Sequence, residues 1–165
     1  MTVPIAIGGS RLDVLLGELS TALAAADPTP YDEGDGRSTF HPAFVAMVQA
    51  SEEPDDTAHL AFDLNVVDSP VDGFDRMNSG RAIQFASVCS LVLSYRLRDD
   101  TDNADVRGMH SALLDLCRVV LAWDGGWTND ATVSTEITNR GRLVGRDGAW
   151  LRYQILFTLR YAEVL

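Results

Sequence analysis

Residues 83–98, IQFASVCSLVLSYRLR, and residues 151–161, LRYQILFTLRY, decide the fold of this chain of 165 amino acids. In both segments apolar side chains alternate with small or polar ones, which is the period of two expected of a β-strand with one buried face. Strands of small domains usually have about 5–6 residues, and both segments are longer than that. The second half of the chain is therefore predicted to contain long strands of one sheet.

A helix is predicted between these two strands. The acidic run 99–103 offers N-cap oxygens and negative charge where a helix dipole favours them, and Gly125-Gly126 supplies the stop, so the helix is expected over 104–123. Its apolar stripe consists of Val106, Met109, Leu113, Leu116, Cys117 and Val120. A further, weakly apolar strand is predicted from Val133, and Asp147-Gly148 is a strong signal for the hairpin that leads into the last strand.

The first half of the chain predicts one helix, one strand and two long loops. Ser10 and Asp13 fit a capping box, and a helix over 12–26 should end at the run Asp27-Pro28-Thr29-Pro30. Alternation over 60–66 predicts a strand, whereas punctuation by proline and glycine predicts loops at about 28–56 and 68–84. The apolar stripe of the helix consists of Leu12, Leu15, Leu16, Leu19 and Leu23.

These elements predict a single α+β domain over residues 1–165. It should contain one mostly antiparallel sheet of about four strands, with two helices packed on one face. Small or semi-polar residues such as Ala86, Ser90 and Ser94 would occupy the other face. That face could be solvated or packed against a neighbouring subunit, since the pattern fits both arrangements.

The charge balance argues against a protein that grips nucleic acid. Thirteen basic residues, all arginine, stand against 24 acidic ones, for a net charge of −11 and a pI near 4.5. Such a chain should repel phosphate backbones. No leader-like segment and no stretch of about 18 apolar residues is seen, so a soluble cytoplasmic protein is expected.

No motif predicts catalysis, a metal site or a cofactor. Cys89 and Cys117 lie in apolar periodic segments without nearby metal-ligating residues, which indicates reduced core thiols. His41, His59 and His110 fall on different predicted elements and share no ligand spacing. The sequence therefore predicts no catalytic residue, no metal ligand and no cofactor-binding residue.

Contacts with other chains are the remaining hypothesis for function. The loop 68–84 carries apolar residues without core periodicity, Trp123 and Trp127 bracket the glycine stop, and Trp150 opens the last strand. Packing of the tryptophans in the core is the simpler interpretation, and an interface role is the other. The candidate contact residues are Val71, Phe74, Met77, Trp127, Asp147 and Trp150, of which Phe74, Met77 and Trp150 are expected to be exposed.

From Gln84 to Leu165 the order of elements resembles tail terminator proteins of long-tailed bacteriophages. The strand 87–98, the acidic cap, the helix 104–123 and the closing strand ending in FTLRY carry the resemblance. It implies a virion protein, assembled in the bacterial cytoplasm, that forms a hexameric ring on the tail tube. The ring would stop tube polymerisation, contact tube and neck proteins, and let DNA pass without specific binding.

Other interpretations stay open at this point. The chain could be another neck or head-completion protein, or a small cytoplasmic ligand-binding or regulatory domain, dimeric through its sheet, with an aromatic pocket. An enzyme that pairs Asp63 with Asp99 is a third possibility. Ligand-dependent melting would favour the binding domain, and a ring in electron micrographs would favour the virion protein.

Overall fold

The computed structural model describes residues 11–28, 39–42, 59–68, 71–75, 82–97, 104–123, 133–147 and 150–164. The chain forms two helices, α1 (Arg11–Ala24) and α2 (Ala104–Ala122), and six strands. In chain order the strands are β1 (His41–Pro42), β2 (Ala61–Asp68), β3 (Val71–Asp75), β4 (Ala82–Arg96), β5 (Ser134–Asp147) and β6 (Trp150–Val164).

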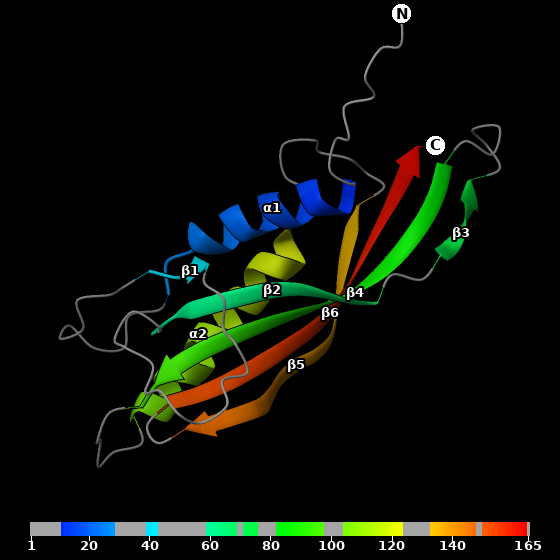
Figure 1. Cartoon of the computed structure of the whole chain (residues 1–165). Helices are drawn as coiled ribbons and strands as arrows, with labels where there is room; N and C mark the ends of the chain where they lie inside the picture. The colour runs from blue at the N-terminus through cyan, green and yellow to red at the C-terminus, as the bar shows by residue number, and fades with distance from the viewer. Residues whose placement is uncertain are drawn as a thin grey trace, which may run out of the picture.

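All six strands belong to one sheet with the order β1-β2-β4-β6-β5 (Figure 1). β2 and β3 both pair with β4, at different places along it. β2 pairs with residues 88–93 of β4, and β3 pairs with residues 82–85 of β4. Every pairing is antiparallel except that of β1 with β2. The two central strands, β4 and β6, pair over fifteen residues each without a register shift.

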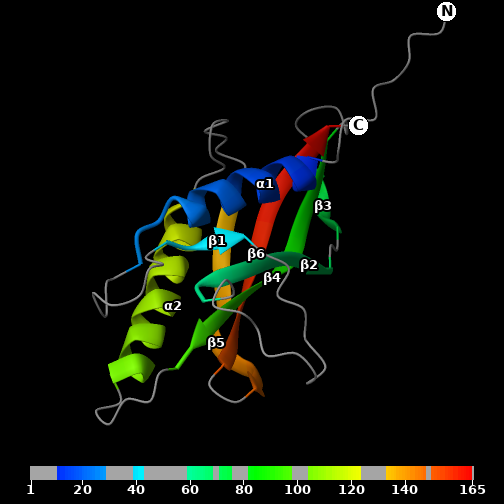
Figure 2. The same cartoon turned by 60° about the vertical axis from the view of Figure 1, so that its left-hand side comes forward.

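Both helices cover the same face of the sheet (Figure 2). Leu15, Leu19 and Leu23 of α1 join the buried face of α2 and the odd-numbered residues of β4 and β6 in one core cluster. Full burial of an aliphatic or aromatic side chain contributes roughly 1.5–3 kcal/mol, so this cluster holds the two layers together. The central strand residues of the cluster are Cys89, Leu91, Leu93, Tyr95, Leu151, Ile155, Phe157, Leu159 and Tyr161.

The predicted α+β class, the mostly antiparallel sheet and the two helices on one face are confirmed. The sheet has six strands instead of about four, because the short strands β1 and β3 join its outer edge. The loop predicted at 68–84 is wrong for residues 71–75, which form β3, and for residues 82–84, which begin β4. Within the loop predicted at 28–56, only 28 and 39–42 are among the described residues, and β1 lies there.

Leu60 fixes the start of β2 with an unusual backbone conformation. It is buried and has a φ of 60°, in the left-handed region that L side chains rarely adopt. Its N–H donates to the carbonyl of Ser94, and its own carbonyl accepts from the N–H of His41. This one residue therefore connects β1 to the sheet.

Candidate functional site

The predicted contact residues do not form one exposed cluster among the described residues. Val71 and Phe74 lie on β3 and Asp147 ends β5, but their side chains lie outside the described part. Met77 and Trp127 lie outside the described residues altogether. Trp150 opens β6 and is only 6% exposed, so its expected exposure is wrong.

Trp150 is buried on the face of the sheet that turns away from the helices. It pairs with Arg96, whose guanidinium carbon lies 5.9 Å from the centre of the indole ring. Ser94 and Arg152, the next pair on this face, are also buried. These residues are already covered within the single chain, so this part of the second face is neither open to solvent nor available to a neighbouring subunit.

The histidines and cysteines are separated and occupied by structural contacts. The N–H of Arg96 donates to Nδ1 of His59 at 3.2 Å, and His110 packs against Tyr153 with 6.4 Å between ring centres. Among the residues that the structure describes, no three His, Cys, Asp or Glu side chains gather closely enough to hold a metal ion.

The two thiols are free and buried, as predicted. Burial raises the pKa of Cys89 from 9.0 to about 12. Burial also raises the pKa of Cys117, and the positive charge of Arg140 partly offsets this effect. The reactive thiolate is thus disfavoured at both positions near neutral pH.

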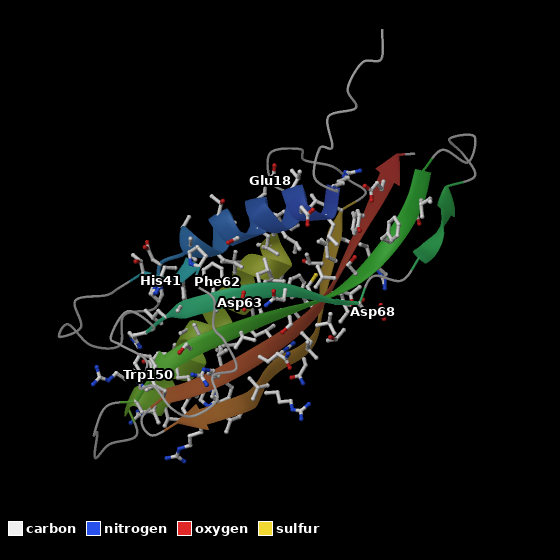
Figure 3. The ribbon with its side chains drawn as sticks, viewed as in Figure 1. Glu18, His41, Phe62, Asp63, Asp68 and Trp150 are labelled. Atoms are coloured by element: carbon white, nitrogen blue, oxygen red, sulfur yellow. The ribbon has the colours of Figure 1, made fainter. Side chains whose placement is uncertain are left out.

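A groove of about 410 Å³ runs between α1 and the start of β2. Asp63 is the one acidic side chain among its described lining residues, and its Oδ2 accepts a 2.8 Å hydrogen bond from the amide of Asn65. Figure 3 shows Asp63 and Asp68 along β2, on the opposite side of the sheet from β5. The lining residues are Leu16, Gly17, Ser20, Pro42, Phe62, Asp63 and Leu64.

We call the outer part of β2 the acidic edge and define it by Asp63, Val66, Val67 and Asp68. Val67 is 61% exposed and Val66 is 39% exposed, although both are apolar. β2 contains no basic residue. The acidic edge therefore combines an exposed apolar pair with two carboxylates, next to the groove.

The opposite side of the sheet carries a second exposed apolar surface. Leu114 and Leu121 of α2 and Leu143 of β5 are each about half exposed. Leu143 pairs with Tyr153, which contacts the ring of His110, and Leu114 lies one helical turn beyond His110. The surface therefore continues from the strand onto the helix.

Two arginines accompany this second surface, which we call the basic edge and define by Leu114, Arg118, Leu121, Arg142 and Leu143. Arg118 is 73% exposed and forms a 2.8 Å ion pair with Asp115, whose side chain is only 11% exposed. α2 and β5 together contain five arginines and four acidic residues, so the positive charge of the basic edge is local and comes from Arg118 and Arg142. The arginines are Arg107, Arg118, Arg140, Arg142 and Arg146, and the acidic residues are Asp105, Asp115, Glu136 and Asp147.

Sequence reasoning missed most of both edges. Val106, which the helical periodicity predicts in the buried stripe of α2, is 37% exposed, and Val66, at the end of the alternating segment 60–66, is 39% exposed. The available signal was the pair Leu114 and Leu121, seven residues apart and both outside the predicted stripe.

No protein-family model and no curated protein sequence matches this chain. Neither described helix is long and apolar enough to cross a lipid bilayer.

Proposed function

We propose that this chain is a structural virion protein that forms a ring, hexameric by the resemblance, at the end of a phage tail tube. The ring stops tube polymerisation and joins the tail to the neck, so its partners are its own copies, the tube protein and neck proteins. It assembles in the host cytoplasm and acts in the virion without catalysis. The observation that carries this proposal is the presence of exposed apolar residues on two opposite sides of one sheet, beside Asp63 and Asp68 on one side and Arg118 and Arg142 on the other.

Two different edges favour a ring over a symmetric dimer. A two-fold dimer brings the same patch of both subunits together, whereas contact between two unlike patches repeats from copy to copy and closes into a ring when the rotation allows. Monomeric proteins seldom expose contiguous apolar patches larger than a few hundred square ångströms. The two edges therefore support self-association through unlike surfaces.

The overall charge supports passage of DNA through such a ring. The net charge of −11 belongs to each copy, and the ring multiplies it. Duplex DNA carries one negative charge per ~1.7 Å, so an acidic ring would not retain the passing strand.

Mass measurement of the purified protein tests the proposal directly. We expect a closed oligomer, visible as rings in negative-stain images, that binds the ends of tail tubes assembled without a cap and stops their growth. A protein that stays monomeric with and without tubes would refute the proposal. Binding to a purified neck or head-completion ring, with no effect on tubes, would assign the chain to that neighbouring role.

The groove between α1 and β2 favours a second candidate, a small ligand-binding domain. Its volume of about 410 Å³ lies within the ordinary range for small-molecule sites, and Asp63 could orient a polar ligand. A rise in melting temperature on screening with metabolites, abolished by Ser20→Phe, would support this candidate. Absence of any ligand-dependent shift would exclude it.

A further inference from the structure

We propose that neighbouring copies associate head to tail, with the acidic edge of one copy seated against the basic edge of the next. The inference rests on the proposed ring and identifies the surfaces that build it. Its occupant is a second copy of this chain, because both complementary surfaces belong to the same polypeptide.

Burial of the exposed apolar residues of the two edges would stabilise the contact. Val67 is 61% exposed on the acidic edge, and Leu121 is 57% exposed on the basic edge. Each square ångström of apolar surface removed from water contributes roughly 25 cal/mol, so apolar residues left exposed on both edges favour contact between them. The groove beside Asp63 offers a concave surface next to the two valines.

The charges determine the orientation of the contact. Asp63 and Asp68 lie on β2, which contains no basic residue, whereas Arg118 and Arg142 belong to the basic edge. Contact between two acidic edges or two basic edges would place like charges together, which costs affinity. Contact between unlike edges brings opposite charges together.

The contact uses side chains and does not extend the sheet. β5 shows three register irregularities along its pairing with β6, and such bulges disrupt the regular backbone that another strand would need. On the opposite side, β1 covers the beginning of β2 and ends in Pro42, which lacks an N–H to donate. Both outer strands are thus poor templates for strand addition.

Two single substitutions block the edges separately. Val67→Arg places a positive charge on the acidic edge, and Leu121→Glu places a negative charge on the basic edge. Both positions are more than half exposed, so the fold should tolerate them. Val14→Glu is the matched control, because Val14 is 52% exposed on α1 and lies on neither edge.

The full-length variants are measured by sedimentation and native mass spectrometry, alone and as a mixture. We expect each blocked variant to be monomeric alone, with association weakened at least about tenfold, equivalent to about 1.4 kcal/mol. An equimolar mixture of the two blocked variants should form at least a mixed dimer, because the intact acidic edge of one variant can meet the intact basic edge of the other. The control should form the native oligomer.

Each alternative outcome has a definite meaning. Suppose that the native chain forms an oligomer, but the mixture of blocked variants forms no mixed dimer or the blocked variants still assemble fully. Either result overturns this interface and leaves the proposed ring standing. A native chain that stays monomeric under all conditions, with tail tubes included, overturns both. Unchanged circular dichroism of the variants shows that a lost contact, and not a lost fold, is being measured.

Discussion

The central strands and the outer strands of the sheet follow different rules. β4 and β6 pair residue for residue over their whole length, and their inward side chains are almost fully buried. β2, β3 and β5 each show register irregularities. Several apolar residues of β2, β5 and the adjoining helix α2 are exposed. The difference indicates that the centre specifies the fold, whereas the edges are available for contacts with other chains.

The largest expected effect compares the centre with the edge by truncating one apolar side chain to alanine in each. Phe157→Ala removes a fully buried ring between Cys89 and Ile137 on the neighbouring strands, and should lower the free energy of unfolding by about 3–5 kcal/mol. Leu143→Ala, on the basic edge and 47% exposed, should lower it by less than about 0.5 kcal/mol. Urea titration of both variants measures the contrast, and similar losses would show that the edge belongs to the core.

The second prediction concerns the pH dependence of stability that arises from the buried thiol of Cys89. The pKa of Cys89 is raised in the folded state from 9.0 to about 12, so the unfolded chain loses its proton first as pH rises. Stability from this group is complete below pH 9 and is lost progressively between pH 9 and about 12.

Cys89→Ala should make the unfolding free energy less dependent on pH in this window, although it lowers stability at pH 7. The comparison uses urea titrations at pH 8 to 11 on both proteins. A variant with the native pH slope would show that other groups cause the alkaline loss.

The centre of the fold could be predicted from the sequence because burial there follows a simple period. Alternation identified β4 and β6, and spacing of three and four identified the inner faces of α1 and α2. β1 and β3 were missed because one has two residues and the other follows Pro70 and contains Gly73, which are usual signs of a loop. Neither strand has enough residues to show a period.

Leu60 offers a third, smaller test, at the junction of edge and centre. Glycine in a strand normally costs roughly 0.5–1 kcal/mol relative to alanine, but a positive φ removes that penalty and strains alanine instead. Leu60→Gly should therefore be at least as stable as Leu60→Ala, although both lose the buried side chain. Thermal unfolding of the two variants decides this, and the usual order, with alanine clearly better, would mean that the strain is absent.

The candidate surfaces were less predictable than the fold. Trp150 was expected at an exposed hairpin tip, but it packs on the second face beside Arg96, because a sequence pattern does not reveal which face of a sheet becomes covered. Leu114 and Leu121 are exposed because α2 lies over β5 at the end of the strand order, where no further strand covers that side of the helix in the described part of the chain. Such exposure depends on tertiary arrangement and not on local periodicity.

The smallest expected effect on stability separates the role of an edge arginine in assembly from its role in folding. Arg118→Ala removes an ion pair whose arginine is 73% exposed but whose Asp115 side chain is only 11% exposed, and should lower the free energy of unfolding by about 1 kcal/mol or less. Asp115 takes part in a further interaction, which limits the loss. Self-association at low salt should nevertheless weaken, because Arg118 belongs to the basic edge.

Arg160→Ala is the control for the loss of one positive charge, since Arg160 also forms an ion pair, with Glu136 at 3.7 Å, but lies on β6, outside both edges. The difference between the two variants in association should shrink as salt rises toward 1 M, where the screening length falls to about 3 Å. Sedimentation at two salt concentrations measures it. Equal weakening by both substitutions would mean that the arginines act through net charge alone, and the distinction between the basic edge and the rest of the sheet would then have no role in assembly.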